Sequence, residues 1–194
     1  MANVDSPDGL SFIGYADGKA PRGGIHRYYK DATAGILAVG DPVIRVTNSS
    51  DPEGGPEIVR HTTGAAVTGV IVAVERKTSN LDSANSMAAA DIGYVWVADD
   101  PNALFEVQED SDGGNLAVTN IGEHIDLVAA IDANTTIGRS KYELDSSALA
   151  TGNTYIIVAK SNRVGNAIGT NCRWIVKANL HTEVNASATN VTEV

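Results

Sequence analysis

Short runs in which apolar and polar residues alternate, separated by turn residues, limit most strongly how this chain can fold. In the run 104–108, Phe105 and Val107 alternate with polar residues, and the run 172–180 repeats this pattern around Trp174. A period of two predicts strands with one buried and one exposed face. The chain also contains 19 glycines, which suit the tight turns that connect such strands. We therefore predict an all-β fold.

About ten strand-like runs occur between residues 25 and 180, which predicts a single β-sandwich or β-barrel-like domain. The runs 92–99 and 104–108, joined by an acidic turn, are expected to form a hairpin. Residues 1–24 show little apolar periodicity and many turn residues, so we expect an extended N-terminal arm. Residues 181–194 are polar and are expected to form a C-terminal tail.

The charge balance argues against two classes of partner. The chain carries 24 acidic and 14 basic side chains, a net charge of −10, so nucleic acid phosphates would repel it. The longest wholly apolar run has only a few residues, too few to span a bilayer. We expect no nucleic acid partner and no membrane partner.

The cysteine and histidine residues, which often bind metals or act as nucleophiles, show no spacing typical of a functional site. Cys172 is the single cysteine and is expected to be a small buried core residue. The histidines lie far apart in sequence and are expected at the surface of strands or loops; they are His26, His61, His124 and His181. None pairs with another at a typical metal-ligand spacing. The sequence therefore predicts neither a metal site nor a bound cofactor.

Two acidic segments resemble parts of a calcium site or a paired-carboxylate site, and we interpret both as turns. The segment 110–113 resembles the start of a calcium loop, but Ile121 occupies the twelfth position, where such a loop needs glutamate. Asp99 and Asp100 could form half of a paired-carboxylate site. Cleft aromatics would then be expected, but Trp96 and Trp174 lie on apolar strand faces, which predicts core packing. We predict no catalytic residues in these segments, and no motif in the sequence supports an enzymatic activity.

Several segments, in their order along the chain, carry a resemblance to a known family. They are Gly40-Asp41-Pro42-Val43, the run 69–75, the run 94–108 with its Asp99-Asp100-Pro101 and Leu104-Phe105-Glu106-Val107-Gln108 parts, Ile137-Gly138-Arg139-Ser140, the run 143–147, and Asn166-Ala167-Ile168-Gly169. Together these segments resemble the head decoration, cement or stabilisation proteins of tailed phages. The likeness extends over residues 25–180.

The resemblance implies a structural virion protein that binds the outer surface of the capsid and bridges neighbouring capsid subunits. The implied partners are the major capsid protein and further copies of this chain, as a homotrimer. It also implies no catalysis and no cofactor.

The most basic and aromatic stretch of this acidic chain is the candidate contact site. We hypothesise capsid or intersubunit contacts for Phe12, Ile13, Tyr15, Arg22, His26, Arg27, Tyr28 and Tyr29. Arginine and tyrosine are enriched at interface hot spots. The alternative is that Tyr28 and Tyr29 are ordinary strand residues.

Three other functions remain open from the sequence. The chain could be a different virion component, such as a tail, neck or head-fibre protein. It could be a virion-associated glycan hydrolase, or a module that binds glycans or host surfaces through its loops.

Overall fold

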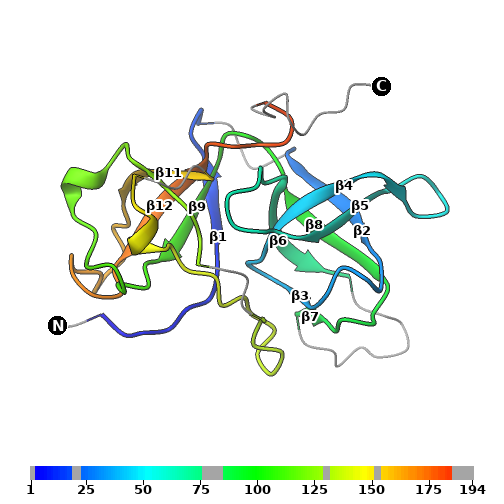
Figure 1. The fold of residues 1–194 in the computed structure, drawn as a ribbon, viewed down its shortest axis with the longest axis horizontal. Helices are drawn as coiled ribbons and strands as arrows, with labels where there is room; N and C mark the ends of the chain where they lie inside the picture. The colour runs from blue at the N-terminus through cyan, green and yellow to red at the C-terminus, as the bar shows by residue number, and fades with distance from the viewer. Residues whose placement is uncertain (1–2, 19–22, 76–84, 129–131, 151–153, 185–194) are drawn as a thin grey trace.

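The computed structural model describes residues 3–18, 23–75, 85–128, 132–150 and 154–184, and these are almost entirely β-structure (Figure 1). The strands are β1 (Ser11–Tyr15), β2 (Ile25–Lys30), β3 (Leu37–Ala38), β4 (Pro42–Ser50), β5 (Pro56–Arg60), β6 (Gly69–Val74), β7 (Ser86–Met87), β8 (Gly93–Ala98), β9 (Ala103–Gln108), β10 (His124–Ile125), β11 (Tyr155–Lys160) and β12 (Arg173–Ala178). Two short 3-10 turns, η1 (Val118–Asn120) and η2 (Ser146–Ala148), complete the elements. The predicted all-β class is confirmed. Among these described residues there is no helix of the length and apolarity needed to cross a membrane.

Five strands close into a barrel, which forms the right-hand half of Figure 1. The order around the barrel is β2-β5-β4-β6-β8; β2 and β5 run parallel, and the other neighbours are antiparallel. Its interior holds the fully buried side chains Val43, Ile58, Ile71, Val95 and Val97. Because successive residues of a strand point to opposite faces, the residues between these face outward.

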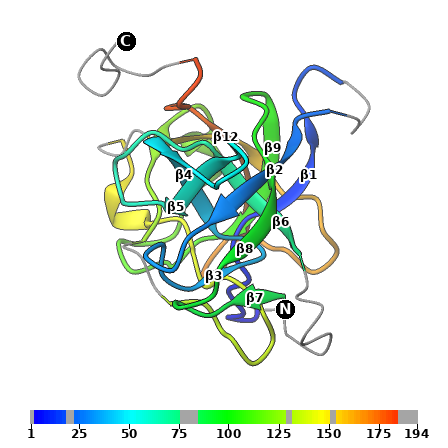
Figure 2. The same ribbon diagram turned by 90° about the vertical axis from the view of Figure 1, so that its right-hand side faces the viewer.

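The other half is a five-stranded antiparallel sheet in the order β1-β9-β12-β11-β10. Its inner face carries Phe105, Trp174 and Val176, all buried as the alternation predicts. Val70 and Ala98, from barrel strands, pack into the same cluster. The core of the sheet half therefore extends onto the barrel strands, while the barrel interior forms a second cluster. The small β3–β7 ladder lies beside the barrel (Figure 2).

The predicted hairpin between the runs 92–99 and 104–108 is wrong. Strand β8 pairs with β2 and β6, whereas β9 pairs with β1 and β12. The connection turns at Asp100, whose carbonyl accepts a hydrogen bond from the Ala103 amide at 2.9 Å. It carries the chain from the barrel into the sheet. An alternating pattern indicates that a segment is a strand, but it does not specify which strand will pair with it.

The predicted N-terminal arm is wrong over residues 3–18. Ser11–Tyr15 forms an edge strand paired with β9, and Leu10 and Tyr15 lie in the core. A strand of five residues carries too few alternating positions to be recognised from sequence beside its glycine-rich surroundings. Residues 19–22 of the predicted arm lie outside the described residues.

The predicted C-terminal tail begins later than expected. His181 is buried and bridges Val67 of the barrel half, and the Thr182 amide donates to the Val67 carbonyl at 3.0 Å. Residues 181–184 therefore pack on the domain. Residues 185–194 lie outside the described part of the chain.

Candidate interaction surface

The outer face of β2 and β8 exposes large apolar and aromatic side chains, on the side of the barrel turned toward the viewer in Figure 2. Val95 and Val97 point into the barrel, so Tyr94 and Trp96 point outward. Trp96 is 41% exposed and Ile92, just before the strand, is 50% exposed. Large apolar side chains that gather on one face are typical of a contact surface.

Arg27 and Tyr29 on β2 complete this face. They pair across the strands with Trp96 and Tyr94, respectively. The Arg27 guanidinium carbon lies 3.4 Å from the centroid of the Tyr94 ring, and the Tyr29 and Tyr94 ring centroids are 5.6 Å apart. These contacts with the Tyr94 ring restrain Arg27 and Tyr29 before any partner binds, which lowers the entropy lost on binding. We call Arg27, Tyr29, Ile92, Tyr94 and Trp96 the aromatic surface.

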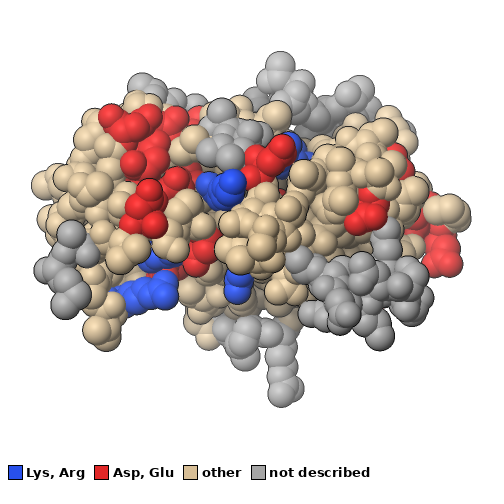
Figure 3. Space-filling model, turned by 90° about the horizontal axis from the view of Figure 1, so that it is seen from below, with Lys and Arg blue, Asp and Glu red and all other residues tan. Residues whose placement is uncertain are grey.

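Carboxylates lie beside Arg27, Tyr29 and Tyr94 of the aromatic surface. The Arg27 Nε donates to Glu75 Oε2 at 2.9 Å, and the Tyr94 hydroxyl donates to the Asp51 carboxylate. The hydrogen bond to Asp51 raises the pKa of Tyr94 above its ordinary value. The side chains that act electrostatically on Arg27, Tyr29 or Tyr94 form what we call the acidic rim; they are Asp31, Asp51, Glu53, Glu57 and Glu75. Figure 3 shows acidic side chains at the barrel end of the molecule.

Buried polar contacts hold β2 and β8 in position beneath this surface. Lys30 is fully buried, and its ammonium donates to the carbonyls of Ala89 and Asp91 at 3.0 and 2.8 Å. These bonds satisfy a cation that would otherwise be costly to bury. They also tie β2 to the segment that leads into Ile92 and β8.

The other end of β2 is anchored by Asp99. The Tyr28 hydroxyl donates to Asp99 Oδ2 at 2.7 Å, and His26 Nδ1 lies 2.8 Å from the same carboxylate. Tyr28 is buried, and burial raises the pKa of its hydroxyl above the ordinary value. Tyr28 is therefore a structural residue of the barrel.

The seven predicted contact residues that the structure describes do not form one surface. Arg27 and Tyr29 belong to the aromatic surface, whereas His26 is exposed beside Asp99 and Tyr28 is buried. The remaining described members lie on β1 in the other half: Phe12, Ile13 and Tyr15. Phe12 packs edge-on against Tyr15 and Phe105, and Tyr15 is in the core, while Ile13 is 48% exposed. Arg22 lies outside the described residues.

Sequence reasoning missed Tyr94 and Trp96. Trp96 was expected in the core, but that place is taken by Val95 and Val97. The alternation places the two aromatic rings on the face opposite the two valines, but it does not indicate which of the two faces is inside. Trp174, by contrast, lies in the core as expected.

Three carboxylates elsewhere come together in a turn. Ligand oxygens of Asp110, Asp112 and Asp145 lie within 4.8 Å of one another. Asp110 Oδ1 accepts from the Ser146 amide at 3.0 Å and hydroxyl at 2.8 Å, and Asp145 Oδ1 accepts from the Ser147 and Ala148 amides at 3.0 and 3.1 Å. A calcium ion needs six to eight oxygen ligands, while Asp110 already closes the turn and Asp145 caps η2.

The histidine prediction is correct only in part. His61 and His181 are buried, not at the surface, and burial lowers the pKa of both imidazoles. Cys172 is buried as predicted, and burial raises the pKa of its thiol, which disfavours a reactive thiolate.

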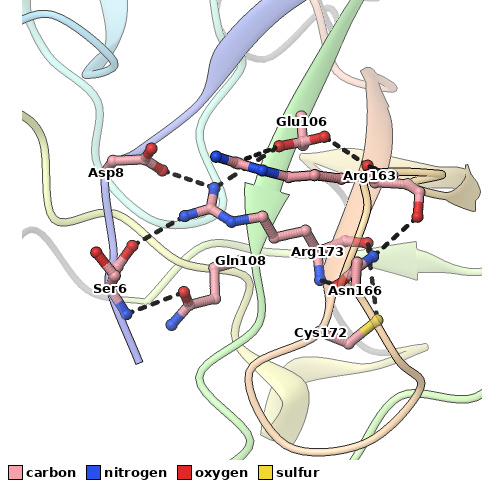
Figure 4. A network of polar contacts seen from close by, with 9 residues as sticks. Ser6, Asp8, Glu106, Gln108, Arg163, Asn166, Cys172 and Arg173 are labelled. Atoms are coloured by element: carbon pink, nitrogen blue, oxygen red, sulfur yellow. Dashed lines mark hydrogen bonds and ion pairs between the residues drawn. The ribbon is translucent and has the colours of Figure 1, made fainter. Parts of the chain in front are cut away.

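A shallow groove separates the N-terminal segment from the loop after β11, and its walls are tied by polar contacts (Figure 4). Arg173 Nη1 donates to Asp8 Oδ1 at 2.7 Å, and Arg163 Nη1 donates to Glu106 Oε1 at 3.2 Å. Each arginine thus has a carboxylate partner. This network fastens the N-terminal segment to the sheet.

Comparison with known proteins gives no relative. No protein-family model, curated protein or solved structure matches the chain.

Proposed function

We propose that this protein is a structural, non-enzymatic component of a tailed-phage particle, located on the outer surface of the capsid. In this role it binds the major capsid protein, bridges neighbouring capsid subunits and assembles as a homotrimer. The ordered motifs between residues 25 and 180 support the proposal through their resemblance to head decoration proteins. The all-β domain is compatible with it.

The observation that carries the proposal is the exposure of Trp96 beside the stacked Arg27 and Tyr94. Tryptophan, tyrosine and arginine dominate interface hot spots, and here all three stand on one rigid face. Such a face gains free energy when a partner removes it from water. Because the contact repeats many times on a particle, a modest affinity per copy is enough.

The experiment is co-sedimentation of the purified protein with capsids that lack it. Saturable binding of the wild-type protein is expected. Trp96→Ala should weaken binding by about 30-fold, the effect of losing about 2 kcal/mol at a hot spot. Val158→Ala is the matched control, because Val158 is 39% exposed on β11 in the other half, and it should bind like wild type.

Electron cryo-microscopy of the decorated particles then locates the protein. Density at regular positions between capsomers is expected. Density confined to the tail, neck or fibres would replace the capsid role with one of those virion roles. A wild-type protein that does not sediment with capsids would refute the proposal.

A second candidate is a glycan-binding module, favoured by the exposed ring of Trp96 on a face that also carries Tyr29 and Tyr94. Aromatic rings offer flat apolar faces with polar neighbours, which suit sugars as well as proteins. Titration with soluble bacterial surface glycans, followed by tryptophan fluorescence, distinguishes the two. A saturable change that Trp96→Ala abolishes would support glycan binding.

A further inference from the structure

We infer that the aromatic surface binds a basic protein surface, one whose apolar centre is surrounded by lysine and arginine side chains. The inference rests on the proposed function in one respect, because it takes this face to be a contact with another protein of the particle. It adds the chemistry of the partner and the residues that select it.

The first step is the charge around the face. The five carboxylates of the acidic rim act on the aromatic surface, whose cation Arg27 is already bonded to Glu75. Two of the five, Asp51 and Glu57, are buried. Glu53 and Glu75 are exposed, so part of this negative charge faces the solvent at the edge of the contact. A partner with the same charge would be repelled, and a basic partner would be attracted.

The second step argues against a two-fold contact between two copies of the chain through this face. In a two-fold contact, the same patch meets itself. The acidic rim of one copy would then lie against the acidic rim of the other.

The third step concerns the centre of the face. Tyr94 and Trp96 lie on the outer side of β8 and exposed Ile92 directly precedes the strand, while Arg27 lies over the Tyr94 ring. An apolar centre inside a charged rim is the usual anatomy of a protein contact. The centre supplies most of the affinity, while the rim selects the partner and speeds association.

The test measures capsid binding by the wild-type protein at about 50 mM and about 500 mM salt, where screening differs strongly. Binding is expected to weaken as the salt rises. At low salt, Glu53→Lys should weaken binding by about tenfold, mainly through slower association. Glu53 is suitable because it is exposed. The control is Asp112→Lys, the same charge change at an exposed site in the other half, which should not weaken binding.

The possible outcomes separate this inference from the proposed function. If the wild-type protein bound capsids at neither salt concentration, the proposed function and the inference would both be overturned. Wild-type binding that is unchanged by salt and by Glu53→Lys would overturn the inference alone. Self-association in sedimentation velocity that Trp96→Ala abolishes would also overturn it, because the occupant would then be a second copy.

Discussion

The indole nitrogen of Trp174 donates a hydrogen bond to the Glu109 carboxylate at 3.1 Å, inside the core of the sheet half. Both side chains are completely buried. The same carboxylate accepts from the Leu116 amide at 2.9 Å, so it satisfies two donors that have no access to water. Burial nevertheless raises the pKa of Glu109.

Replacing Glu109 by leucine should lower the free energy of unfolding by about 3 kcal/mol, because two buried donors lose their acceptor. Trp174→Phe keeps most of the ring packing and loses one donor, so it should cost about 1–2 kcal/mol. Urea unfolding of both variants and of the double variant measures the coupling. If the Glu109→Leu variant were as stable as the wild type, the hydrogen bonds to Glu109 would make no net contribution to stability.

Asp41→Asn should change how stability depends on pH. Asp41 is fully buried, and burial raises its pKa to about 6 although its Oδ2 accepts from the Ala38 amide at 2.8 Å. The folded state therefore holds a proton that the unfolded state releases between about pH 4 and about pH 6. Across this window the wild-type free energy of unfolding falls as the pH rises, by on the order of 3 kcal/mol from this group.

The asparagine variant lacks this loss and should exceed the wild type in stability at pH 7, provided that its carbonyl oxygen takes the Ala38 bond. Chemical denaturation at several pH values checks the slope. Asp112→Asn, at an exposed position, is the control. Parallel curves for wild type and Asp41→Asn would contradict the expectation.

Gly9→Ala should destabilise the protein strongly. Gly9 has φ +73°, and an added Cβ would lie 2.3 Å from Ser140 Cβ and 2.6 Å from the Gly40 carbonyl oxygen. Gly54 has φ +90° with nothing within 4 Å of such a Cβ, so Gly54→Ala isolates the backbone term of about 1 kcal/mol. Thermal unfolding should show a larger loss of stability for Gly9→Ala than for Gly54→Ala. Equal losses would mean that the N-terminal segment shifts at little cost to make room for the added Cβ.

Removing residues 1–24 should unfold or severely destabilise the domain, and not simply remove a capsid contact. The deletion takes away β1 and the buried side chains of Leu10 and Tyr15, each worth about 1.5–3 kcal/mol. Circular dichroism and thermal unfolding test this. A truncated chain with unchanged stability would restore the interpretation of this segment as an arm.

The alternation of the sequence was sufficient to predict the fold class and the inward faces of several strands. Phe105, Val107 and Trp174 are buried as predicted, because strands with one wet face leave a clear pattern. Gln108 was expected on the wet face but is buried, bonded to Asp5 and Glu143 at 3.0 and 2.9 Å. Asp5 and Glu143, which are distant from Gln108 in the sequence, supply the hydrogen bonds that make its burial possible.

The candidate surface could be predicted only in part. Arg27 and Tyr29 were included because basic and aromatic residues stand out in an acidic chain, while Trp96 was assigned to the core. Both faces of β8 carry large side chains, so alternation alone does not decide which face is inside. The closure of the barrel determines which face of β8 lies inside, and the side chains there are Val95 and Val97.

The pairing of the N-terminal strands sets the order in which the chain can fold during synthesis. Strand β2 needs β8, with Ile25 opposite Ala98, and β1 needs β9, with Phe12 opposite Phe105. Neither strand has its antiparallel neighbour until about the first hundred residues have left the ribosome, and the sheet also waits for β12 at Arg173–Ala178. Contacts so distant in sequence slow folding. We therefore expect the barrel to close during translation and the sheet to assemble only after the chain is nearly complete.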